Sequence, residues 1–182
     1  MHRICVISDD VYYLKGFSEA ISESICTISF SGIRKCFEEI KQDDDDTFFI
    51  ISLRSLVLTR RLVTRMAERG MNVIVVYDIP ENMLYSHACF LSKRNSAEYI
   101  TRFLMDVLLG KHRKAFHITP RQTEIVQKLT AGNYQKRLAC DDERSVKTIS
   151  GLKKTITRRI GFKTMNSLSL LFSEIIILSV KV

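Results

Sequence analysis

Short apolar runs alternate with segments of helical periodicity through the first 109 residues of the chain. Five runs rich in Val, Ile and Phe have the composition of buried strands, and they cover residues 3–8, 25–30, 47–53, 71–77 and 88–92. The segments between and after them predict helices at residues 12–24, 33–40, 57–69, 82–87 and 97–109. This alternation predicts an α/β fold, with a doubly wound, parallel five-stranded sheet and helices on both faces.

The carboxyl ends of the strands are where an open α/β sheet gathers its functional groups. Polar side chains at or just after the ends of the predicted strands are Asp9, Asp10, Ser52, Tyr77 and Lys93. Asp9 and Asp10 form an acidic pair of the kind that holds a divalent cation. The alternative is a solvated pair that Lys93 neutralises.

After residue 109 the strand pattern stops. Residues 110–117 are polar and basic, which predicts a linker, and residues 118–182 show only helical periodicity. Thr119, Pro120 and Gln122 predict a capping box at the start of a helix that Gly132 ends. Further helices are predicted at residues 135–141, 145–160 and 168–178. Four helices in one compact segment, the third of them basic, describe a helix-turn-helix module.

Residues 145–161 predict one amphipathic helix with two distinct faces. The buried stripe consists of Val146, Ile149, Leu152, Ile156 and Ile160, and the opposite face carries Lys147, Ser150, Gly151, Lys154 and Arg158. The whole segment contains no acidic residue. Solvated helix faces usually mix charge signs, because Glu–Lys pairs four residues apart are stabilising. The missing acids therefore predict a helix that lies in a nucleic-acid groove.

The charge of the chain is concentrated in its second part. Residues 1–110 hold 13 Lys and Arg against 15 Asp and Glu, a net −2, whereas residues 111–182 hold 15 against 5, a net +10. A strongly basic segment favours a polyanionic partner. We therefore assign a polyanionic partner, of which double-stranded DNA is one, to the C-terminal part only.

Residues 118–162 contain ITPRQTEIVQKLTAG and SVKTISGLKKTITRRIGF, which resemble the DNA-binding domain of LuxR/FixJ-type (NarL-like) transcription regulators. The resemblance implies that Ser150, Gly151 and Lys154 read the major groove, and that Lys147 and Thr148 contact phosphates. It also implies dimerisation through the last helix. Further phosphate contacts are expected from the remaining cations of the segment, which are Lys153, Arg158 and Arg159.

Two features depart from that family pattern. Ser150 occupies a position that the family usually fills with lysine. Asp142 and Arg144 occupy usually apolar positions in the turn before the recognition helix. The sequence leaves two explanations for the polar turn: an irregular backbone, or a partner that covers it.

Residues 3–109 resemble the receiver domain of the same regulators. Asp9, Asp10 and Lys93 match the acidic pair and the lysine of a receiver, but Ser52 stands where the family has its phosphate-acceptor aspartate. Tyr77 replaces the small hydroxyl residue after the fourth strand. A serine hydroxyl with no adjacent base is a poor nucleophile. The resemblance therefore implies a pseudo-receiver over residues 1–109.

Several classes of function are not expected. The four histidines and five cysteines show no metal-ligand spacing, so we expect neither a zinc site nor another cofactor. The acidic run at residues 43–46 lacks the spacing of a calcium loop, and no nucleophile–base arrangement predicts an enzyme. Unpaired cysteines and the absence of a signal peptide favour a cytoplasmic protein without a membrane span.

The sequence thus predicts a sequence-specific, DNA-binding transcription regulator that works without phosphorylation. Its domains would be a receiver-like unit at residues 1–109, a linker at 110–117 and a helix-turn-helix domain at 118–182. Dimerisation is expected, as a homodimer or as a heterodimer with another regulator. One alternative is an auxiliary protein that acts mainly by heterodimerising with a true response regulator. Another is a phosphorylation-switched regulator that uses Asp9 or Asp10.

Overall fold

The computed structural model describes residues 3–21, 25–29, 47–85, 90–109, 118–132 and 135–179. Three predictions fall outside these residues: the helix at 33–40, the solvated acidic run at 43–46 and the linker at 110–117. All four histidines also lie outside them.

The strands form a parallel sheet in the order β2-β1-β3-β4-β5. Their bounds are Arg3–Ser8 for β1, Ile25–Ser29 for β2, Thr47–Ser52 for β3, Asn72–Tyr77 for β4 and Leu91–Ser92 for β5. The register pairs Ser8 with Ser52 and Tyr77 with Ser92, so the carboxyl ends of the strands share one edge. The predicted parallel α/β arrangement is confirmed.

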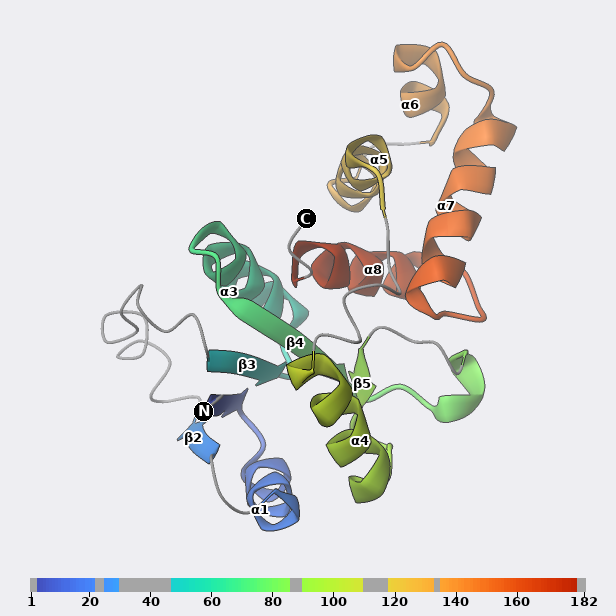
Figure 1. Ribbon diagram of the computed structural model, residues 1–182. Coiled ribbons are helices and arrows are strands. Elements are labelled where there is room, and N and C mark those ends of the chain that lie inside the picture. The colour runs from blue at the N-terminus through green and yellow to red at the C-terminus, as the bar shows by residue number, and fades with distance from the viewer. Residues whose placement is uncertain are drawn as a thin grey trace.

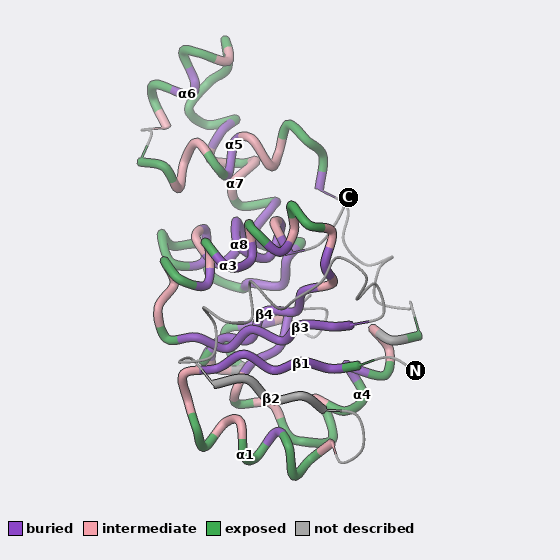
Figure 2. Tube along the Cα trace, turned by 90° about the vertical axis from the view of Figure 1, so that its left-hand side faces the viewer, coloured by how far each residue is buried: buried purple, intermediate pink, exposed green. Residues whose placement is uncertain are grey.

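Helices cover both faces of this sheet (Figures 1 and 2). On one face, α1 (Val11–Ala20) and α4 (Ala97–Leu108) contribute Phe17, Phe103 and Leu104 to an apolar cluster with the strands. On the other face lie α3 (Leu56–Glu68) and the C-terminal helix α8 (Ser167–Ser179). The β-branched residues of β1, β3 and β4 are therefore buried from both sides, as a parallel sheet requires.

The remaining helices are α5 (Pro120–Thr130), α6 (Gln135–Asp141) and α7 (Val146–Ile160). The predicted capping box is confirmed: Thr119 Oγ1 accepts from the Gln122 amide at 3.3 Å, and Gln122 Oε1 accepts from the Thr119 amide at 3.1 Å. Ser145 caps α7 by accepting from the Thr148 amide at 3.0 Å. Gly161 ends α7 at φ 118°, a left-handed conformation that favours glycine.

Helix α8 belongs to the core of both parts of the chain. It packs against α5 and α7 as well as against α3 and β4, and its buried residues join Phe49 and Val75 of the strands in one apolar cluster.

The described part of the β4–β5 connection forms a single 3₁₀ turn, η2 (Glu81–Met83), where the sequence predicted a helix at residues 82–87. After that turn the backbone is extended, because Leu84 pairs with Phe162 in an antiparallel bridge.

Candidate nucleic-acid interface

Helix α7 lies at the outer side of the molecule (Figure 1). Its apolar stripe is buried through Ile149, Ile156 and Ile160, while Leu152 is half-buried. The prediction for Val146 is wrong, because this residue is 41% exposed. Val146 opens the helix directly after residues 143–145, which are also exposed, so little protein covers the first turn.

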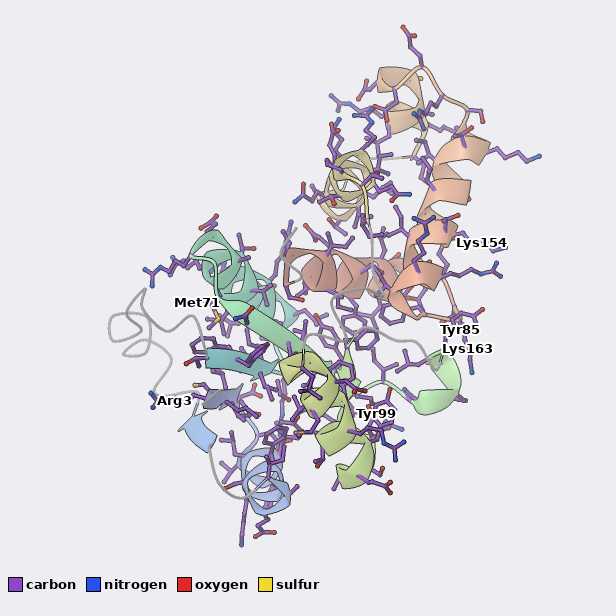
Figure 3. The ribbon with its side chains drawn as sticks, in the orientation of Figure 1. Arg3, Met71, Tyr85, Tyr99, Lys154 and Lys163 are labelled. Carbon is purple, nitrogen blue, oxygen red and sulfur yellow. The ribbon has the colours of Figure 1, made fainter. Side chains whose placement is uncertain are left out.

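The outward face of α7 carries most of the predicted DNA-binding residues. The predicted residues that are exposed are Lys147, Thr148, Gly151, Lys154, Arg158 and Arg159, and Thr155 is exposed as well. Lys147, Gly151, Lys154 and Arg158 follow each other at steps of three and four residues, so they share one side of the helix. Figure 3 shows Lys154 on the side of α7 turned away from the sheet.

Two of the predicted residues do not lie in the middle of this face. Ser150 is half-buried and borders it. Lys153 is also half-buried and follows Gly151 by two residues, which places it nearly opposite that glycine on the helix. The structure therefore brings Lys153 closer to the apolar stripe than to the outward face.

Gly151 leaves an opening in the outward face that packing does not require. A Cβ built at this position would meet no atom of the described residues within 4 Å, and the residue is exposed. Glycine inside a helix costs about 1 kcal/mol relative to alanine. No close approach within the described part of the chain explains that cost, which leaves the position open to contact with another molecule.

The polar turn before α7 is held from within the chain. Arg121 at the start of α5 forms an ion pair with Asp142, whose side chain is only 4% exposed. Hydrogen bonds to Glu124 and then to Asp142 raise the pKa of Arg121. The turn is irregular, with Glu143 at φ 52° and the Arg144 amide donating to the Ala139 carbonyl at 2.8 Å. Sequence reasoning missed Arg121, although an acid at an apolar position is a signal for a nearby cation.

At the carboxyl edge of the sheet, both acids are occupied by the protein itself. The Asp9 carboxylate accepts from the Arg54 amide through both oxygens, at 3.2 and 3.1 Å. Asp10 caps α1, because its Oδ1 accepts from the Tyr13 amide at 3.1 Å. Its Oδ2 lies 3.3 Å from Lys93 Nζ. The bond from Tyr13, followed by Lys93, holds the pKa of Asp10 below its usual range.

Ser52 and Tyr77 are buried near the same edge. Ser52 is fully buried, its carbonyl accepts from Ser8 Oγ at 2.8 Å, and its own hydroxyl has no partner among the described residues. The Tyr77 ring packs against Phe172 of α8, with ring centroids 4.1 Å apart. Burial raises the pKa of Tyr77. The Tyr77 ring thus contacts the C-terminal helix α8.

Removing the Asp10 carboxylate should destabilise the protein in a pH-dependent way. We expect Asp10→Ala to lower the free energy of unfolding by about 1 kcal/mol at pH 7, the usual effect of losing a helix N-cap. A lowered folded-state pKa stabilises above the unfolded value of about 4 and ceases to do so as the pH falls through the folded value. Urea unfolding at several pH values should therefore show the difference from wild type shrinking in acid. Asp10→Asn keeps the cap, so a loss as large as that of Asp10→Ala would contradict this account.

Among the described residues, no group of three or more His, Cys, Asp or Glu side chains is placed to hold a metal ion. Within the same ranges, no helix combines the length and apolar character needed to cross a membrane.

Comparison with known proteins gives structural neighbours only. No protein-family model and no curated protein matches the chain. RcsB from Salmonella enterica serovar Typhimurium, bound to promoter P1flhDC, is 15% identical over 97% of this chain and 100% of its own, with a TM-score of 0.47. An RcsB–DNA complex is 14% identical over all of both chains at a TM-score of 0.43. Full-length FixJ from B. japonicum is 14% identical over 96% of this chain and 97% of its own, at 0.42. The RcsB of that DNA complex is a two-component response regulator.

Proposed function

We propose that the protein is a transcription regulator that binds duplex DNA sequence-specifically, with α7 in the major groove. The observation that carries this proposal is the outward face of α7. It presents Lys147, Lys154 and Arg158 around the opening at Gly151, and no acid lies on the helix. A helix of this width fits the major groove, and clustered cations neutralise backbone phosphates.

The position of each residue suggests its role. Lys154 and Gly151 would approach base edges together with Ser150 at the border of the face. Lys147, Thr148 and Arg158 would contact phosphates, which fix the register of a protein on the duplex. Lys153 would contribute to the electrostatic attraction from the flank of the helix.

We assign the α/β unit, residues 1–109, as a pseudo-receiver that works without aspartyl phosphorylation. Asp9 and Asp10 are engaged by backbone amides and by Lys93, and Ser52 is fully buried. A phosphoryl switch on either acid would first have to break these bonds. The geometry therefore gives no support to the alternative in which Asp9 or Asp10 accepts a phosphoryl group.

We also propose that residues 110–117 form the linker and residues 118–182 the helix-turn-helix domain. The protein would act in the cytoplasm. Dimerisation remains part of the proposal, with a second copy or with another regulator. In this structure α8 packs inside the molecule, so dimerisation through this helix would require it to separate from α3 and β4.

A partner protein that covers the polar turn at Asp142 and Arg144 would favour the auxiliary role. Asp142 has a partner inside the chain, because Arg121 pairs with it. The turn therefore needs no second protein to cover it, and direct DNA binding is the function that the geometry supports best.

Replacing Lys154 should weaken DNA binding without unfolding the protein. A duplex sequence is first selected from a random pool with the purified wild type. We expect Lys154→Ala to bind it about tenfold more weakly, since one good base contact contributes about 1–3 kcal/mol. If Lys154 also meets a phosphate, the salt dependence of the affinity falls by about one counterion. The fold should survive, because Lys154 is exposed.

The matched control is Lys15→Ala, which removes the same charge from an exposed position on α1. It should leave both the affinity and its salt dependence close to wild type. Equal losses from the two substitutions would reduce the effect to net charge, and an unchanged affinity for Lys154→Ala would overturn the assignment of α7.

A further inference from the structure

Four aromatic rings meet where the sheet joins the C-terminal helices, and we name Tyr77, Phe90, Phe162 and Phe172 the junction cluster. Tyr77 lies 4.1 Å from Phe172 and 6.0 Å from Phe90, measured between ring centroids. Phe162 lies 5.0 Å from Phe90 and 6.1 Å from Phe172. All four residues are buried. Three of the separations lie within the range of about 4.5–7 Å that is typical of stabilising aromatic pairs, and Tyr77 and Phe172 are in closer contact.

The members of the junction cluster come from elements that are far apart in the sequence. Tyr77 is the last residue of β4, and Phe90 directly precedes β5. Phe162 follows Gly161, the residue that ends α7, and Phe172 lies within α8. The cluster therefore connects the carboxyl edge of the sheet to the end of the proposed recognition helix.

Backbone hydrogen bonds make the same connection. The Tyr85 amide donates to the Gly161 carbonyl at 2.8 Å, and the Lys163 amide donates to the Met83 carbonyl at 2.9 Å. These bonds flank the bridge between Leu84 and Phe162. Figure 3 shows Tyr85 and Lys163 side by side at this point, where Lys163 Nζ lies 6.0 Å from the centre of the Tyr85 ring. The end of α7 is held through side chains and backbone together.

We propose that Tyr77 is a positioning residue for DNA reading, which sets the orientation of α7 through Phe172 and Phe162. This inference rests on the proposed DNA-binding function. Gly151 lies ten residues before Gly161, about 15 Å along the helix axis. A tilt of about 10° at the junction would move Gly151 by about 2.6 Å, more than the spread of hydrogen-bond lengths. Contacts made ten residues away thus depend on the junction.

The ring of Tyr77, and not its hydroxyl, is the part that sets the orientation of α7. The hydroxyl is buried and has no partner among the described residues, whereas the ring makes both of the contacts described above. Tyr77→Phe therefore keeps what the proposal requires, and Tyr77→Leu removes it while leaving an apolar side chain in the core.

Duplex affinity and amide exchange of the full-length chain test the proposal. We expect Tyr77→Leu to bind the selected duplex about tenfold more weakly, at a temperature where circular dichroism shows every variant folded. The Tyr85 and Lys163 amides should also exchange faster with solvent. Tyr77→Phe should behave as wild type in both measurements.

Val75→Ala is the control for a purely structural effect. Val75 lies two residues before Tyr77 in β4, is buried on the same face and is not one of the four rings. It should lower stability and leave both the affinity and the two amides unchanged. Wild-type affinity in Tyr77→Leu, or an equal loss of affinity in Val75→Ala, overturns the proposal. If the wild type selects no duplex, the proposed DNA-binding function is refuted instead. In that case the exchange measurement still tests the junction, because unchanged exchange of the Tyr85 and Lys163 amides in Tyr77→Leu refutes the role of Tyr77.

Discussion

Arg60→Met should lower the free energy of unfolding by about 3 kcal/mol, the lower end of the usual cost of leaving one buried charge without its partner. Arg60 Nη2 lies 2.6 Å from Glu174 Oε1, and the Glu174 side chain is only 2% exposed. Its second oxygen has no hydrogen-bond partner among the described residues. The Arg60 side chain itself is 41% exposed, which is why we expect the lower end.

The double variant Arg60→Met with Glu174→Met separates the cost of the charge from that of the contact. Replacing both members of a buried pair by apolar residues of similar size is often neutral. We therefore expect urea unfolding to place the double variant close to wild type and well above Arg60→Met. A double variant no more stable than Arg60→Met would show that Glu174 is not the source of the loss.

Gly151→Gln should change stability and DNA affinity in opposite directions. Glutamine is a good helix former, so we expect a gain of about 1 kcal/mol, which raises the melting temperature by about 3 °C in a chain of this size. The added side chain would project from the outward face of α7 and hold the backbone away from the duplex. We expect at least a tenfold loss of affinity, because contacts on both sides of it would be lost (about 1–3 kcal/mol each).

Gly16 provides a matched control for this substitution. It lies within α1, it is exposed, and a Cβ there would also meet no atom within 4 Å among the residues that the structure describes. Gly16→Gln should therefore give a similar gain in melting temperature, with no change in DNA affinity. If Gly151→Gln left the affinity unchanged, the outward face of α7 would not be the surface that approaches DNA.

Local sequence patterns predict those features of this protein that depend on interactions between residues close in the sequence. The capping box at Thr119 and Gln122 is an example, because its two hydrogen bonds join residues three apart. The outward face of α7 is another, since helical spacing alone determines which residues share a side. Val146 shows the limit of helical periodicity. The spacing indicates that Val146 lies on the apolar side of the helix, but not whether neighbouring helices extend far enough to cover it.

Contacts between distant segments could not be predicted in this way. Nothing in the run around Glu174 indicates Arg60, 114 residues earlier, as its partner. The apolar character of α8 on all sides does indicate deep burial, but not that α3 and β4 would bury it. The resemblance to a receiver assigns Tyr77 a position in the sequence pattern only. Its contact with Phe172 depends on how β4 and α8, which are far apart in the sequence, pack together.

The place of α8 in the core has a consequence for how the chain matures during synthesis. Domains generally fold as units as the chain emerges, the N-terminal one first. Here one face of the sheet at β4 is covered by α3 alone until the ribosome has delivered residues 167–179, because they form the second helix that packs on it. Contacts between such distant segments also slow folding. We therefore expect the nascent α/β unit to expose apolar surface through most of translation, and to depend on chaperones over that interval.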